Sequence, residues 1–225
     1  VTFLMWLATV STSCVSLLLK SRFSMPSGMD IAHSIGFVVL SSLTAAWTQC
    51  LLSVCRALAA LVDRFCCEMA AGVLDIPHAM EEWNVMQAVL LKVSQGIEWN
   101  FISMLIAIGF TAPLLMVDFL SMGAAVEVVP PLVPIGLVTL LLLRVFFIAA
   151  GISDKCARVP ALANSLSFGV GAEHRRQILI DYILRSDAGF HVRDVRLTMA
   201  MAFKFLYMWC VVGFGLATKV IADSA

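Results

Sequence analysis

The stretch that most constrains this chain is its last apolar segment, residues 199–221. Its centre, residues 206–214, reads LYMWCVVGF and carries no charged side chain. A helix needs about 20 apolar residues to cross a bilayer, and this segment meets that length. It follows directly on a charged, amphipathic stretch, residues 173–204. The sequence therefore predicts a polar helical region that leads into a membrane-spanning helix.

The composition places the chain as a whole in the membrane class. Of its 225 residues, 61% are hydrophobic and 13% are charged, whereas soluble domains are roughly half apolar and a quarter charged. The formal net charge of +0 argues against a nucleic-acid partner. The seven cysteines are scattered in or beside apolar runs without a CxxC pair, which favours buried free thiols over a zinc site. We expect neither a metal nor a cofactor.

Five segments have the length and apolar character of membrane spans, and all five are predicted to be helical. They are residues 1–19, 31–54, 99–119, 132–152 and 205–221. The segments between them, residues 55–98 and 153–204, carry charged residues at helical spacing and are predicted to be helical extensions outside the membrane. The predicted fold class is thus all-α, a polytopic transmembrane helical bundle with long cytosolic helical extensions.

Three positions are predicted to interrupt or bend these helices. Pro77 is expected to break the helix that follows the second span, with Glu81 and Glu82 in the first turn of the next helix, where acidic residues suit the positive end of the helix dipole. Pro113 lies inside the third span and is expected to kink it, because proline removes one backbone hydrogen bond. The tripeptide at residues 188–190, Ala-Gly-Phe, marks a break before the last helix.

The distribution of lysine and arginine predicts the orientation, since cytosolic loops carry an excess of these residues. The segments after the second and fourth spans hold most of the basic residues, and the other side holds only Lys20, Arg22 and Lys219. The long segments are therefore predicted to be cytosolic, with the C-terminus outside. The basic residues on the cytosolic side are Arg56, Arg64, Lys92, Lys155, Arg158, Arg175, Arg176, Arg185, Arg193, Arg196 and Lys204.

The sequence lacks the usual catalytic patterns. No histidine pairs with a carboxylate at a motif spacing, and there is no GxSxG elbow, SxxK pair or Walker-type loop. We expect a protein that is not an enzyme.

Arg144 is the one charge well inside a predicted span. Such residues usually face a bundle interior or water, which suggests binding or gating, with Glu98 as its expected partner. The alternative is an arginine near a helix end that extends to the cytosolic headgroups.

Residues near the C-terminus carry a family resemblance. Tyr207 and Phe214 are separated by six residues, in the order Leu206-Tyr207, five hydrophobic residues, then Gly213-Phe214. This run is similar to the final-helix signature Thr-Tyr, five hydrophobic residues, Gln-Phe of the insect gustatory and odorant receptor superfamily, although threonine and glutamine are replaced. The break at residues 188–190 resembles the Gly-x-Phe-like element that precedes that helix. The chain is thus similar to a divergent member of this superfamily of seven-helix ligand-gated ion channels.

The resemblance implies a function. It implies a gustatory receptor-like subunit of a homotetrameric ligand-gated cation channel, with a chemosensory role in the plasma membrane. Membrane lipid, cations and an unknown small-molecule ligand would be its partners, and the five spans would be the last five of seven. Alternatives are a secondary transporter, in which Arg144 and the breaks at Pro113 and Pro134 mark a midplane site, and a scaffold without transport.

The final helix would line the pore of such a channel. Residues three and four apart share a helix face, so Cys210, Gly213, Phe214 and Ala217 form one stripe and are the predicted pore-lining residues. By resemblance, Cys210 and Phe214 stand at the hydrophobic gate.

The cytosolic extensions would join the subunits of the tetramer. The apolar stripe of the basic amphipathic helix at residues 172–186 is expected to be covered by other subunits or by the preceding cytosolic helices. That stripe consists of Ile178, Ile180, Ile183 and Leu184.

Overall fold

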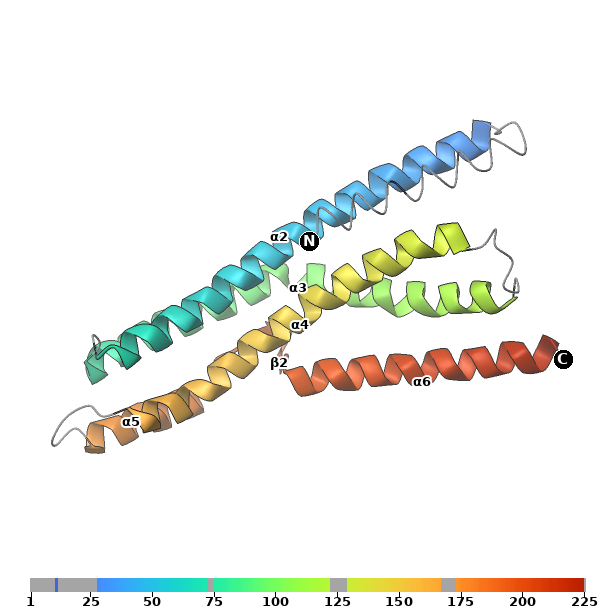
Figure 1. The fold of residues 1–225 in the computed structure, drawn as a ribbon. Helices are drawn as coiled ribbons and strands as arrows, with labels where there is room; N and C mark the ends of the chain where they lie inside the picture. Colours follow the sequence, from blue (N-terminus) through green and yellow to red (C-terminus); the bar gives the residue numbers. More distant parts are fainter. Residues whose placement is uncertain (1–10, 12–27, 73–74, 122–128, 167–172, 225) are drawn as a thin grey trace. The chain divides into compact units, whose positions relative to one another are not determined.

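The computed structural model describes residue 11 and residues 28–72, 75–121, 129–166 and 173–224. Over these ranges the chain is all-α, as predicted, apart from one two-stranded hairpin (Figure 1). The first predicted span, residues 1–19, lies outside the described residues except for residue 11. The elements follow in the order α2 (Gly28–Ala70), α3 (Ile76–Ser121), α4 (Val129–Ser165), α5 (Glu173–Arg185), β1 (His191–Val192), β2 (Val195–Arg196) and α6 (Met199–Ser224).

Three of the helices are much longer than a bilayer requires. Helices α2, α3 and α4 contain 43, 46 and 37 residues. At a rise of 1.5 Å per residue they extend over roughly 55 to 69 Å, about twice the 30 Å of a hydrocarbon core. Each continues without interruption between a predicted span and the polar residues beside it, and α3 passes through Pro113 as one helix.

The connection between α2 and α3 differs from the prediction by one turn. Helix α2 ends before Gly72, whose φ of +68° lies in the left-handed region that suits a glycine at a helix C-terminus. Helix α3 begins at Ile76, so Pro77 is in its first turn, where the missing N–H is not needed. Pro77 thus starts α3 instead of ending α2. Glu81 and Glu82 lie in the second turn of α3, because α3 begins earlier than the charge pattern indicated.

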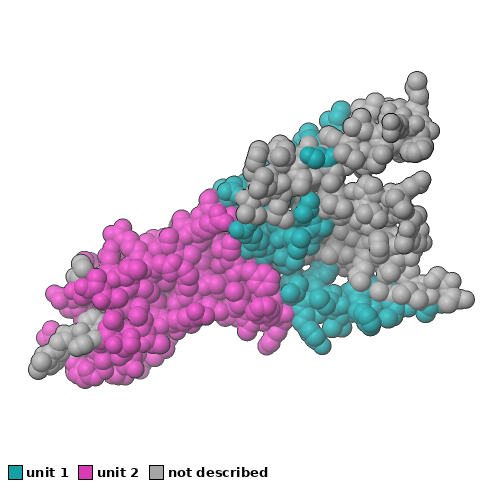
Figure 2. Space-filling view, in the orientation of Figure 1, with its two compact units in different colours: residues 1–51, 103–145, 205–225 teal, residues 52–102, 146–204 magenta. Residues whose placement is uncertain are grey.

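The chain divides into two compact units (Figure 2), and the boundary between them falls inside each long helix. Unit 1 comprises residues 1–51, 103–145 and 205–225. Unit 2 comprises residues 52–102 and 146–204, and it contains α5 and the hairpin together with parts of α2, α3, α4 and the start of α6.

Unit 2 has a continuous apolar core. Phe65 of α2 and Trp83 of α3 have ring centroids 5.4 Å apart. Phe101 of α3 lies 6.3 Å from Phe146 of α4. Aromatic rings that meet in tilted arrangements at such distances stabilise the packing beyond the area that they bury. Other fully buried side chains of this core are Leu52, Val62, Met69, Leu90, Ile152 and Leu179.

In unit 1, two buried polar side chains are satisfied by their own helix. The hydroxyl of Thr48 donates to the carbonyl oxygen of Thr44 at 2.6 Å, and that of Ser41 donates to Val38 at 3.0 Å. Such hydrogen bonds let hydroxyl groups sit on an otherwise apolar helix at little cost. Gly109 of α3 faces Trp209 of α6, since a Cβ placed on the glycine would be 3.7 Å from the indole ring.

Helix α6 has the character of a membrane span. Within the described ranges, one helix is long and apolar enough to cross a membrane, over Met199–Leu216, and only 11% of that stretch is buried. The last helix predicted at residues 199–221 is confirmed as a helix by α6, which begins at Met199.

Candidate functional site

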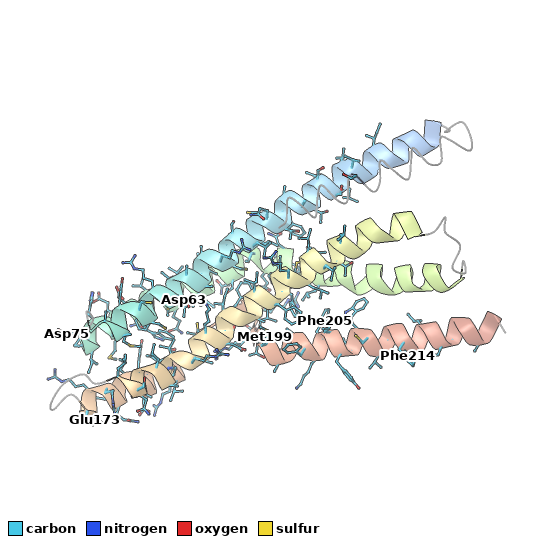
Figure 3. The ribbon with its side chains drawn as sticks, in the orientation of Figure 1. Asp63, Asp75, Glu173, Met199, Phe205 and Phe214 are labelled. Carbon is cyan, nitrogen blue, oxygen red and sulfur yellow. The ribbon has the colours of Figure 1, made fainter. Side chains whose placement is uncertain are left out.

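The start of α6 is held by side chains from two places in the sequence. Thr198 precedes the helix, and its hydroxyl accepts a hydrogen bond from the Met201 amide at 3.3 Å. Asp154 of α4 accepts one from the Met199 amide at 3.4 Å, and Figure 3 marks Met199 at the first turn of α6. A threonine cap and a carboxylate at the positive end of the helix dipole both stabilise a helix N-terminus. Helix α4 therefore fixes where α6 begins.

The hairpin before α6 is tied to the same part of α4. Its strands pair antiparallel, His191 opposite Arg196 and Val192 opposite Val195. Ser153 is fully buried, and its hydroxyl accepts a hydrogen bond from the Phe190 amide at 2.9 Å. Phe190 is itself fully buried, and its ring lies 5.1 Å from that of Phe101. The backbone that enters the hairpin is thus bonded to α4 and packed into the core of unit 2.

Arg196 links the hairpin to both flanking segments. Its Nη2 donates to the backbone oxygen of Ser153 at 2.8 Å, and its Nη1 donates to the Asp187 carboxylate at 3.2 Å. The His191 ring lies 3.1 Å from the Gly189 carbonyl and 3.5 Å from the same carboxylate. We call the set Ser153, Asp154, Asp187, His191, Arg196 and Thr198 the polar junction.

Gly189 makes the polar junction possible. A Cβ at this position would lie 2.8 Å from Arg196 Nε and 2.9 Å from Ser153 Oγ, closer than side chains approach each other. The predicted break at residues 188–190 is therefore real, and its glycine is explained by close approach of side chains from α4 and β2.

A third residue of α4 extends the connections to α2. Lys155 Nζ donates to Asp63 Oδ2 at 2.5 Å, and Figure 3 marks Asp63 on α2. Consecutive residues Ser153, Asp154 and Lys155 thus contact the hairpin, α6 and α2 in turn. Sequence reasoning missed this triplet, although its three polar residues directly after a long apolar run were a visible signal.

The thiols in this region are set in apolar surroundings. Burial raises the pKa of the Cys156 thiol from 9.0 to about 11. Burial is also the main cause that raises the pKa of Cys66, to which the nearby Asp63 carboxylate adds. Thiols in such settings stay protonated and unreactive at neutral pH. Among the described residues, no group of three histidine, cysteine, aspartate or glutamate side chains is placed to hold a metal ion.

The tip of the hairpin reaches α3. Arg193 has a φ of +52°, in the left-handed region. Its Nε lies 3.6 Å from Glu98 Oε1, and its guanidinium group lies 5.3 Å from the centre of the Trp99 ring. Glu98, which we expected to pair with Arg144, therefore faces Arg193.

Arg144 itself is half-buried on α4, between the buried residues Leu142 and Val145. No acidic side chain within the described ranges forms a salt bridge with it.

The residues predicted to line a pore differ in exposure along α6. Cys210 is exposed, and Phe214 is 70% exposed. Tyr207 of the family motif is 72% exposed. Gly213 is buried, and the side chain of Ala217 lies outside the described ones. Exposure is not confined to the face of Tyr207, Cys210 and Phe214, since Met208 and Val212 on other faces of α6 are 55% and 48% exposed.

Helix α5 packs within its own chain through one of its faces. Leu179, Ile180 and Ile183 are buried in unit 2. At the end of this helix, Trp83 Nε1 of α3 donates to the Ser186 hydroxyl at 2.8 Å. Two residues predicted on the same apolar stripe are exposed instead, Ile178 by 45% and Leu184 by 62%. Ile180 and Ile183 of the predicted stripe are thus covered within the chain. Of the two expected arrangements, cover by preceding helices or by other subunits, the first holds for this part of the stripe.

No protein-family model, no curated protein and no solved structure matches the chain.

Proposed function

We propose that the chain is a subunit of a homotetrameric ligand-gated cation channel, similar to gustatory receptors. Unit 1 would cross the membrane, unit 2 would lie in the cytosol, and α6 would line the pore. The polytopic arrangement, the plasma-membrane location, the external C-terminus and the chemosensory role all belong to this proposal.

The observation that carries the proposal is the match between the two compact units and the charge of the chain. Unit 2 contains eleven of the fifteen basic residues and eleven of the fifteen acidic ones, although it is the slightly smaller unit. Charged side chains are costly inside a bilayer and an excess of lysine and arginine favours the cytosolic side. The units are defined by packing alone, so their agreement with the charge distribution supports the division into a membrane part and a cytosolic part. The acidic residues of unit 2 are Asp63, Glu68, Asp75, Glu81, Glu82, Glu98, Asp154, Glu173, Asp181, Asp187 and Asp194.

The exposure of α6 supports a role for it between subunits. Tyr207, Cys210, Val211 and Phe214 have the spacing of one helix face, and all four are exposed in the single chain. An apolar face of this kind is unsuited to water, but four copies around an axis would form a narrow hydrophobic constriction. Apolar rings can stop ions by excluding water, so such a gate requires no charge.

The polar junction supports coupling between α6 and the other helices. Since Asp154 and Ser153 hold the start of α6 and the hairpin, a shift of α4 would be transmitted to α6. A ligand would shift the gate only by binding the open and closed states unequally. Unit 1 ends at Val145 on α4, so Arg144 lies directly before the boundary with unit 2. This position favours a contact with lipid headgroups over the midplane site that a transporter would need.

A thiol experiment tests the proposed pore. In full-length protein whose other six cysteines are replaced, a charged thiol reagent added from outside should change the current through Cys210, and Cys210→Ser should abolish the effect. Phe214→Ala should raise the leak current, because it widens the constriction.

The matched control places the thiol on another face of the same helix. Val212→Cys, combined with Cys210→Ser, adds a thiol at a residue that is 48% exposed but lies off the Tyr207–Phe214 face. It should react without a comparable change in current. A conducting protein in which Cys210 and Val212→Cys respond alike would exclude this face of α6 as the pore lining.

A further inference from the structure

Two locally unfavourable features meet at the tip of the hairpin. A two-residue turn with a positive φ normally carries glycine or asparagine, yet this position holds Arg193, with φ +52°. Its neighbour Trp99 is 69% exposed, although a large aromatic ring gains most from burial. Neither feature helps unit 2 to fold in water. Their contact at 5.3 Å indicates a shared role at the surface.

Along α3, Trp99 directly follows Glu98 and begins a run without charged residues, residues 99–117. Before it, the polar Lys92 and Gln95 are exposed, and so are the apolar Val85, Val89 and Leu91. After it, Ile106 and Phe110 are exposed by 54% and 69%. Tryptophan is enriched where such a change coincides with a membrane–water interface, because its ring is apolar and its indole N–H is polar.

The boundary between the compact units falls close to Trp99 along α3 and close to Lys204 along α6. On α3 the boundary falls between residues 102 and 103, about one helical turn after Trp99. On α6 it falls directly after Lys204, which is exposed. Trp99 on α3 and Lys204 on α6 thus each lie within about one helical turn of the end of unit 2.

Arg193 keeps donors for an external anion. Its Nε faces Glu98 at 3.6 Å, while its side chain is 62% exposed. Within the described ranges no carboxylate pairs with its two terminal nitrogens. Guanidinium groups bind phosphate through two parallel N–H groups, and stacking on an aromatic ring holds the group in a fixed plane. The pair with Glu98 and Trp99 therefore orients the guanidinium without occupying all of its donors.

We propose that Trp99 and Arg193 form a lipid-anchoring pair that binds the headgroup phosphate of anionic phospholipids at the cytosolic membrane surface. The inference rests on the proposed membrane placement of unit 1. In it, the strained turn places Arg193 over the indole ring, Trp99 enters the interfacial layer, and Lys204 adds to the positive charge of the same level. The hairpin that precedes α6 then binds the bilayer surface as well as α4.

Quenching by brominated lipids tests where Trp99 lies. The full-length protein is placed in nanodiscs of phosphatidylcholine brominated either near the headgroup or near the chain end. The difference between wild type and Trp99→Phe isolates Trp99, whose fluorescence should be quenched more strongly by the shallow bromines. Trp83→Phe removes a buried indole of the same unit and should leave the absolute intensity lost to each brominated lipid unchanged.

Binding of anionic lipid tests Arg193. In nanodiscs of phosphatidylcholine with phosphatidylserine, Arg193→Gln should reduce the phosphatidylserine retained per chain several-fold, and Arg193→Lys should keep part of it. Arg185→Gln removes the same charge from an exposed residue at the end of α5 and should have no effect.

The outcomes separate this inference from the proposed function. If deep bromines quench Trp209 while Trp99 is not quenched at all, unit 1 is in the membrane but the anchoring pair is excluded. Retention of phosphatidylserine by Arg193→Gln also excludes it, and a crosslink from Arg193→Cys to a second copy would identify a protein contact instead. If neither tryptophan is quenched, the membrane placement itself fails.

Discussion

Gly189 is the residue whose missing side chain matters most to the polar junction. Gly189→Ala would place a Cβ 2.8 Å from Arg196 Nε and 2.9 Å from Ser153 Oγ. Relief of such overpacking costs typically about 1–3 kcal/mol, since Ser153 and Arg196 are held by their own hydrogen bonds. We expect the midpoint of thermal unfolding of the purified protein to fall by several degrees.

Gly96→Ala is the matched control for this substitution. Gly96 lies inside α3, and a Cβ there would meet nothing within 4 Å. Because alanine favours a helix interior over glycine by roughly 0.5–1 kcal/mol, this variant should be slightly more stable than wild type. Equal destabilisation by both variants would show that the close approach at Gly189 is not a constraint.

At the scale of elements, α5 presents one face to its own chain and leaves another exposed. Ile180 is 7% exposed and Leu184 is 62% exposed. Ile180→Asp should unfold unit 2, because an unpaired carboxylate in an apolar core costs several kcal/mol. Leu184→Asp should preserve the fold and, if α5 contacts another subunit, shift the proposed tetramer toward smaller species.

Thermal unfolding and native gels in parallel separate the two effects. A variant with an unchanged unfolding midpoint and a smaller assembly identifies the exposed face of α5 as a subunit contact. If Leu184→Asp leaves the assembly intact, the contact lies on another element. A fully folded Ile180→Asp would contradict the packing of α5 against its own chain.

For the molecule as a whole, the decisive prediction concerns the two sides of the membrane. A tag inserted beside Asp75, between α2 and α3, should be labelled only after permeabilisation of cells, because unit 2 carries most of the basic residues. A tag after Ala225 should be labelled on intact cells. Labelling of both tags from the same side would contradict the predicted topology and the receptor-like function that the resemblance implies.

Much of the helical architecture was accessible from the sequence because it depends on local properties. Long runs of apolar residues and the scarcity of helix-breaking residues predicted the long helices, and Gly189 correctly marked a break. The start of α3 was misplaced by a turn, since Pro77 is compatible with the first turn of a helix as well as with the end of one.

The residues that organise the candidate site were less accessible, because their partners are distant in sequence. Ser153 binds Phe190, Asp154 binds Met199 and Lys155 binds Asp63, across separations of 37, 45 and 92 residues. The hairpin, with two residues in each strand, is too short to leave a periodic pattern. Helical spacing placed Gly213 with Cys210 and Phe214; in the single chain Gly213 is buried and the other two are exposed, and their place in a pore stays a prediction.

By itself, the sequence determined that this protein is helical, highly apolar and divided between charge-poor and charge-rich stretches, because these properties follow from the order of side chains along one helix at a time. The tertiary structure alone decided that the charge-rich stretches of five helices form one compact unit, that α4 holds the first turn of α6, and that Arg193 lies on Trp99. Those contacts depend on which faces of different helices meet. Packing selects that pairing from many that the local pattern allows.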